Sequence, residues 1–143
     1  MKRMITITLF SMFLTVLSAP PNHSAVVFEA EVARPYEAIW TAICQVESSG
    51  DQFAVGDKHL KHHSYGISQI RLSRLDDFYR QTSIRYSETD MFCPVKSKQV
   101  FIHYAVQIGP YNYERIAREW NSGPSGMKRK STLKYWQKIQ REL

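Results

Sequence analysis

The sequence predicts an all-α protein: a single domain of short helices packed around one buried central helix. The chain has 143 residues, a length that suits one domain. Hydrophobic residues make up 43% of the chain and charged residues 22%, with six Gly and six Pro, which excludes a disordered or fibrous protein. Apolar residues recur mostly at the helical period of about 3.6, and the alternation typical of strands is scarce.

The N-terminal segment has the order of a signal peptide. A basic start in residues 1–3 precedes an apolar stretch in residues 4–17, and small residues with two prolines follow in residues 18–21. As a helix the apolar stretch would rise about 21 Å, short of the roughly 30 Å of a bilayer core. We therefore expect a signal peptide in residues 1–25, rather than an uncleaved anchor, with no defined cleavage site. Residues 26–143 would form the mature domain, without a membrane span, in the bacterial periplasm or outside the cell.

The first helix is predicted over residues 35–48. Pro35 suits the first helical position because its missing N–H would be unpaired there anyway. Tyr36, Trp40 and Ile43 recur on one face, which is typical of a helix that packs on a core.

The middle of the chain is predicted to be less regular. Residues 51–63 form a polar loop, and residues 64–70 form a short turn that Ser64 can cap. Residues 72–81 have the spacing of another short helix, and residues 83–93 are irregular.

A helix over residues 94–108 is predicted to be the buried central helix. Pro94 stands at its first position, and its polar side chains form one narrow stripe, which consists of Lys96, Gln99, His103 and Gln107. Most of its other residues are apolar, and a helix with so narrow a polar stripe is largely buried.

Two further helices are predicted in the last third of the chain. Asn112 can cap one helix and Ser131 the other. A loop rich in Gly, Ser and Pro over residues 121–126 separates them.

Glu47 breaks two local rules at once. It continues the apolar stripe of the first helix, and it falls in the last turn, where the helix dipole disfavours an acid. Such conflicts tend to mark functional sites. Partial burial and the helix C-terminus both disfavour the charged form, so the pKa of Glu47 should rise. A raised carboxyl pKa suits a general acid near neutral pH, and this predicts Glu47 as the catalytic acid.

Three short motifs in order resemble those of the lysozyme-like lytic transglycosylases, the family of soluble lytic transglycosylase catalytic domains. Residues 47–50 (Glu-Ser-Ser-Gly) resemble the glutamate-serine motif of that family. Residues 65–70 (Tyr-Gly-Ile-Ser-Gln-Ile) resemble its Gly-Leu-Met-Gln segment, and residues 117–124 (Ala-Arg-Glu-Trp-Asn-Ser-Gly-Pro) resemble its Ala-Tyr-Asn-x-Gly motif. The resemblance covers about residues 35–142 and implies a lysozyme-like fold built around a long groove.

The resemblance also implies a reaction. The family cleaves the β-1,4 bond between N-acetylmuramic acid and N-acetylglucosamine in peptidoglycan. Glu47 would protonate the glycosidic oxygen and then act as base, so that the muramoyl 6-hydroxyl attacks C1 and a 1,6-anhydro product forms. No metal and no organic cofactor are implied.

Five residues within these motifs are candidate substrate-binding residues, which are Ser48, Gly66, Gln69, Asn121 and Gly123. A glycine such as Gly66 lets a sugar approach the backbone closely. The amides of Gln69 and Asn121 offer both donors and acceptors to sugar hydroxyls. Plain turn chemistry for the glycines, and capping or a buried paired amide for Gln69 and Asn121, remain the alternatives.

The chain departs from the family pattern at two positions. Trp120 stands where the family often has Tyr, and it fits the apolar stripe of its helix, so we expect core packing. If the family's tyrosine contacts substrate, that role is either lost here or passes to another aromatic, Tyr104 or Tyr65. Ser68 stands where Met is usual, which weakens the second motif.

A hydrolytic lysozyme needs a second carboxylate, as base or nucleophile. Asp57, in the polar loop, is the best candidate, and Asp51, Asp76 and Asp77 are others. A solvated turn residue after a glycine is the alternative for Asp57. The sequence thus predicts a lytic transglycosylase first, a muramidase that uses Glu47 and Asp57 second, and a non-catalytic wall-binding module third.

The chain has two cysteines, which could form a disulfide, and three loop histidines, which could bind a metal. In an exported chain an even cysteine count favours a disulfide, here between Cys44 and Cys93, with buried free thiols as the alternative. His59, His62 and His63 lack the helical spacing of a metalloprotease motif, so we predict no metal site.

The net charge favours an acidic partner. It is +6 for the whole chain, and loss of the two leader cations would leave +4. Lys128, Arg129 and Lys130 form a basic run, but no helix carries a recognisable DNA-reading motif. We expect a monomer that acts on peptidoglycan glycan strands, with no nucleic-acid partner.

Overall fold

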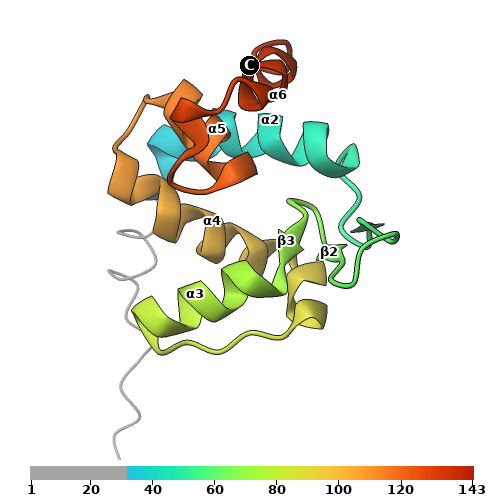
Figure 1. The fold of residues 1–143 in the computed structure, drawn as a ribbon. Coiled ribbons are helices and arrows are strands. Elements are labelled where there is room, and N and C mark those ends of the chain that lie inside the picture. The colour runs from blue at the N-terminus through green and yellow to red at the C-terminus, as the bar shows by residue number, and fades with distance from the viewer. Residues whose placement is uncertain (1–31) are drawn as a thin grey trace, which may run out of the picture.

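The computed structural model describes residues 32–143, so the predicted signal peptide lies outside the described residues. Figure 1 shows α2 lying between α6 and α4, with α3 on the far side of α4 and the strands at one end. Between residues 32 and 143 no helix has the length and hydropathy needed to cross a membrane.

Helices account for most of the described elements. In chain order the elements are η1 Arg34–Tyr36, α2 Glu37–Ser48, β1 Val55–Gly56, β2 Ser64–Tyr65, β3 Ile70–Arg71, α3 Leu72–Thr82, η2 Glu88–Phe92, α4 Pro94–Ile108, α5 Tyr113–Ser122, η3 Gly126–Lys128 and α6 Ser131–Ile139. The predicted helices over residues 35–48, 72–81 and 94–108 are confirmed to within a residue or two.

A small antiparallel sheet corrects the all-α prediction. The strands lie in the order β1-β2-β3, with Val55 opposite Tyr65 and Ser64 opposite Arg71. The segment 64–70, expected as one turn, is instead two strand ends joined by a tight turn. Each strand has two residues, too few for alternation to be visible in the sequence.

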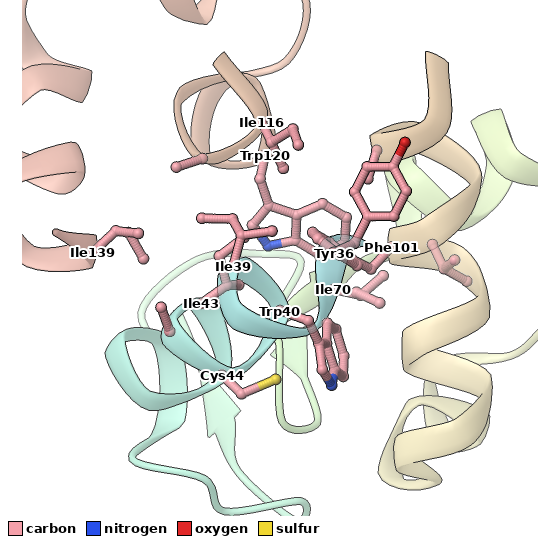
Figure 2. Close-up of a cluster of buried hydrophobic side chains, with 14 of the residues drawn as sticks. Tyr36, Ile39, Trp40, Ile43, Cys44, Ile70, Phe101, Ile116, Trp120 and Ile139 are labelled. Atoms are coloured by element: carbon pink, nitrogen blue, oxygen red, sulfur yellow. The ribbon is translucent and has the colours of Figure 1, made fainter. Parts of the chain in front are cut away.

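The core is built around α2. Its buried side chains are Ile39, Trp40, Ala42, Ile43 and Cys44. Figure 2 shows side chains of neighbouring helices gathered around it, among them Phe101, Trp120 and Ile139. The Trp40 and Phe101 ring centroids are 5.1 Å apart, and those of Phe101 and Trp120 are 5.4 Å apart. These aromatic contacts tie α2 to α4 and α5.

The helix expected at the centre, α4, is buried on one face only. Val100, Phe101 and Ala105 are buried, whereas Val95 is 66% exposed and Val106 is 41% exposed. The prediction of a largely buried helix was therefore wrong. A narrow polar stripe does not guarantee burial, because apolar side chains also supply much of a protein's surface.

Buried Arg118 fixes the connection from α5 to α6. Its Nε donates to Thr132 Oγ1 at 2.9 Å, its Nη1 donates to Glu114 Oε1 at 2.6 Å, and its Nη2 donates to the Met127 carbonyl at 2.9 Å. A Cβ at position 126 would lie 2.1 Å from the Arg118 carbonyl oxygen, so only Gly126 fits there. This network sets where α6 lies against α2.

Both cysteines are free, which overturns the predicted Cys44–Cys93 disulfide. Cys44 is buried on α2, and Cys93 is exposed at the start of α4. Burial, reinforced by the charge of Glu47, raises the pKa of Cys44 to about 12. A protonated, buried thiol is a poor nucleophile, so Cys44 acts as a small core residue. Cysteine count gives no information on which side chains face each other.

Candidate active site

One cleft of about 740 Å³ contains most of the predicted site residues. It is bordered by the end of α2, the sheet, α3, α4 and α5. The lining includes Glu47, Asp57, Gln69, Asn121 and Gly123, which lie far apart in the sequence. The fold therefore brings the first and third motifs to one cavity.

Glu47 lies in the last turn of α2, which ends at Ser49 in the left-handed conformation with φ 56°. The Tyr135 hydroxyl, from α6, donates to Glu47 Oε1 at 2.8 Å. Burial raises the pKa of Glu47, and the negative charge of Asp57 adds to that rise. The Tyr135 hydrogen bond lowers the pKa, as do the charges of Arg71 and Arg74, but burial outweighs them. Glu47 therefore holds a proton to higher pH than an exposed glutamate.

The surroundings of Asp57 lower its pKa, whereas those of Glu47 raise the pKa of that residue. It follows β1 with φ 54°, and its Oδ2 accepts from Arg71 Nη2 at 2.6 Å and from Arg71 Nε at 3.0 Å. These hydrogen bonds lower the pKa of Asp57. Asp57 therefore stays ionised near neutral pH.

The two carboxyl groups thus have pKa shifts of opposite direction within one cleft. A carboxyl group of raised pKa and a second one that stays ionised are the pair that glycosidases use. Asp77 also lines the cleft and also has a lowered pKa. Its Oδ2, however, accepts a hydrogen bond from the Tyr104 hydroxyl at 2.9 Å. The negative charge of Asp57 is among the main causes of the raised pKa of Glu47. Asp57 is accordingly the better placed second carboxylate.

Ser48 and Gly66 have structural contacts. Ser48 Oγ donates to the Ile67 carbonyl at 2.8 Å, which links the end of α2 to the β2–β3 turn. Gly66 has φ 75°, and a Cβ there would lie 1.9 Å from the Met91 carbonyl oxygen. Backbone packing against η2 therefore accounts for this glycine.

Gln69 uses its amide within the protein. Its Oε1 accepts from Ser64 Oγ at 2.7 Å, and its Nε2 donates to the Gly66 carbonyl at 2.9 Å and to the Ala54 carbonyl at 3.2 Å. These bonds hold the three strands together at the edge of the cleft. Gln69 shapes the cleft wall through these bonds.

Asn121 and Gly123 border the other side of the cleft. Asn121 is exposed, and its side chain makes no hydrogen bond within residues 32–143. Gly123, with φ 73°, ends α5. The Asn121 amide is therefore exposed at the rim of the cleft.

Trp120 packs in the core, as the sequence predicted. It is 8% exposed, and its Nε1 donates to the Ser68 carbonyl at 3.3 Å. Ser68 is fully buried in the turn beneath it. Of the two alternative aromatics, Tyr104 lines the cleft, whereas Tyr65 packs against Phe92, outside the cleft lining.

The loop histidines and remaining acids add little to the site. In the described part of the chain, no group of His, Cys, Asp or Glu side chains could hold a metal ion. Asp51 accepts from the Phe53 backbone N–H at 2.8 Å in an exposed turn. Asp76 is exposed on α3, away from the main cleft.

Tyr135 and Arg74 belong to the site, although the sequence does not predict either of them. Tyr135 reaches Glu47 across 88 residues of sequence, from the half-exposed side of an ordinary amphipathic helix. Arg74 lines the cleft from α3. Neither residue breaks a local rule, so no signal in the sequence marks them.

Comparison with known proteins now identifies the family. A lysozyme from Magallana gigas is 31% identical over 123 residues, which cover 82% of this chain and 88% of the relative. The chain belongs to the lysozyme family. No protein-family model matches the sequence.

A solved structure agrees with this lysozyme assignment. A chain in the crystal structure of Aeromonas hydrophila PliI in complex with Meretrix lusoria lysozyme is similar, with a TM-score of 0.61 and 25% identity. The match covers 73% of this chain and 88% of that chain. The lysozyme-like fold is thus supported, whereas the finer resemblance to lytic transglycosylases is not.

The contact between Tyr135 and Glu47 predicts a shift in the pH dependence of glycan cleavage when the contact is removed. Tyr135→Phe removes a hydrogen bond that favours the charged form, so the pKa of Glu47 should rise further. The alkaline limb of the kcat/KM profile should move up by about one to two pH units, since hydrogen bonds to charged groups contribute ~1.5–3 kcal/mol.

Tyr113→Phe is the matched control for Tyr135→Phe. Tyr113 donates its hydroxyl to the Pro35 carbonyl at 3.1 Å, away from Glu47. Removal of the Tyr113 hydroxyl should leave the pH dependence of kcat/KM unchanged. An unchanged alkaline limb in Tyr135→Phe would contradict the assigned role of the phenol.

Proposed function

We propose that the protein is a muramidase that hydrolyses the β-1,4 bond between N-acetylmuramic acid and N-acetylglucosamine. The observation that carries the proposal is the pair of cleft carboxylates with opposite pKa shifts, raised for Glu47 and lowered for Asp57. Membership of the lysozyme family supports it.

Glu47 is the general acid in this proposal. Tyr135 occupies Oε1, so Oε2 is the oxygen available to carry the proton to the glycosidic oxygen. Proton transfer lets the leaving sugar depart as positive charge develops at C1. The deprotonated Glu47 can then accept a proton again, which completes the cycle.

Asp57 supplies the second carboxylate. Arg71 keeps it ionised through two hydrogen bonds to Oδ2. An ionised carboxylate stabilises the positive charge at C1, and it either attacks that carbon or takes a proton from the attacking water. Both routes end with oxygen from water on C1.

A lytic transglycosylase, the first hypothesis from sequence, needs one acid and no second carboxylate. The structure offers a second one with its own ion pair, and the named relative is a lysozyme. Hydrolysis therefore replaces transglycosylation as the preferred proposal.

Digestion of purified peptidoglycan sacculi in heavy-oxygen water tests the proposal. We expect muramic acid reducing ends that carry one heavy oxygen atom, detected by mass spectrometry. Products with 1,6-anhydromuramoyl ends would contradict hydrolysis and restore the transglycosylase. Binding without any product would instead point to a non-catalytic wall-binding module.

Export follows from the same proposal. Peptidoglycan lies outside the cytoplasm, and the signal peptide predicted for residues 1–25 would bring the domain to it. We propose that the protein acts outside the cell or in a periplasm, as a monomer without a metal or organic cofactor.

A further inference from the structure

Arg74 presents an unusual cation to the cleft. It lies on α3, and its guanidinium carbon is 4.4 Å from the ring centroid of Trp120 and 4.8 Å from that of Tyr104. Its Nη2 also donates to the Trp120 carbonyl at 2.8 Å. Two aromatic faces and one carbonyl thus hold the group in place.

The charge of Arg74 has no carboxylate partner in the described chain. Two other cleft arginines do have one: Arg71 pairs with Asp57 at 2.6 Å, and Arg115 pairs with Glu119 at 2.8 Å. Glu47 and Asp77 act on Arg74 only through their more distant charges. Since burial lowers the pKa of Arg74, the site has desolvated a cation without pairing it.

Most of its hydrogen-bonding capacity is also unused. A guanidinium carries five N–H donors, and in residues 32–143 only one hydrogen bond of the Arg74 side chain is formed. A planar fork with free donors matches the two oxygens of a carboxylate. The contacts with the Trp120 and Tyr104 rings restrict the movement of that fork before a ligand binds.

We propose that Arg74 forms a subsite for a carboxylate of the glycan, so that the cleft favours an acidic muramoyl strand over a neutral N-acetylglucosamine strand. The inference rests on the proposed function, and it adds which glycan strands the enzyme prefers. The carboxylate belongs either to the lactyl group of muramic acid or to the peptide stem attached to it. A purely structural Arg74, which only joins α3 to α5, is the competing explanation.

The test compares Arg74→Gln with the native protein on two substrates. One is a peptide-free muramoyl glycan strand, and the other is an N-acetylglucosamine oligomer of equal length. Any effect through the charge on Glu47 falls on both substrates alike, so the readout is the ratio of the two kcat/KM values. Loss of a charged hydrogen bond should lower the ratio of the acidic strand to the neutral oligomer by about tenfold or more. Arg74→Lys should recover part of that ratio.

Arg115→Gln is the matched control, because it removes a cleft arginine whose charge is already paired. It should leave the ratio of the two kcat/KM values unchanged. If Arg74→Gln lowers both rates equally, its role is structural and the proposal is overturned. A peptide-bearing strand distinguishes the sources: loss confined to it assigns the stem carboxylate, whereas loss on peptide-free strands assigns the lactyl group.

A binding measurement on the native protein does not depend on the variants. Calorimetric titration with N-acetylmuramic acid should give a Kd about tenfold lower than titration with its methyl ester, which lacks the charge. Equal affinities, together with an unchanged rate of Arg74→Gln on the peptide-bearing strand, would refute the carboxylate subsite even if the enzyme is a muramidase. A native protein that prefers the acid but cleaves no glycan would instead refute the proposed function alone.

Discussion

Glu47→Gln should lower turnover of wall glycan by about 10²–10⁴-fold, the usual contribution of a positioned general acid. The amide is nearly the same size and can still accept the Tyr135 hydrogen bond, but it has no proton to give to the glycosidic oxygen. Release of soluble muropeptides from sacculi measures the loss. Glu37→Gln, on the exposed start of the same helix, should keep full activity. Retained activity in a folded Glu47→Gln protein would refute Glu47 as the acid.

Although Glu47→Gln should lose activity, its free energy of unfolding should increase. Because the pKa of Glu47 is raised in the folded state, the folded protein loses stability as pH rises through that pKa. The glutamine variant has no such loss, so it should match the native protein below the ordinary glutamate pKa and exceed it at higher pH. The helix dipole alone contributes about 0.3–1 kcal/mol to this gain. Thermal melts of both proteins at acidic and mildly alkaline pH measure the difference.

Asp57→Asn should remove the reducing muramic acid ends almost completely, with a loss of about a hundredfold or more. The amide preserves the shape of the turn, but it cannot supply negative charge at C1 or a base for water. Arg71 also loses its ionic partner, which leaves a cation beside the reaction centre. Product analysis by mass spectrometry measures the reducing ends directly.

Asp77→Asn is the control for Asp57→Asn, since Asp77 is another cleft carboxylate with a lowered pKa. Its carboxylate is engaged by Tyr104 and Arg80, so its loss should affect the rate far less. A larger loss in Asp77→Asn than in Asp57→Asn would assign the second carboxylate to Asp77.

The features that the sequence could predict are those set by residues close together in the chain. Glu47 stood out because helical periodicity places it on a buried stripe, and that periodicity spans only a few turns. The core position of Trp120 was predictable for the same reason. Asp57 could be named as a candidate, but the ion pair that keeps it charged comes from Arg71 on another strand. Such pairings depend on tertiary structure and leave no mark on the local pattern.

The wrong predictions concern features that depend on tertiary structure rather than on the local sequence. The sheet escaped notice because its strands are too short to alternate, and α4 looked more buried than it is because its outer face carries valines. The disulfide was inferred from a count of cysteines, whereas bond formation depends on where the chain brings Cys44 and Cys93. Tyr135 and Arg74 obey every local rule, so only the assembled fold shows what they contact.

The position of Tyr135 on α6 has a consequence for biosynthesis. Glu47 lies on α2, the earliest of the described α-helices, and α6 is the latest. During synthesis from the N-terminus, the carboxylate of Glu47 emerges long before the phenol that bonds to it. Until α6 docks, Glu47 is less buried, so its pKa stays closer to that of an exposed glutamate even though the Tyr135 hydrogen bond is also missing. A nascent or partly unfolded chain thus holds the proton of Glu47 only at lower pH, and the acid gains its raised pKa when the last helix has taken its place.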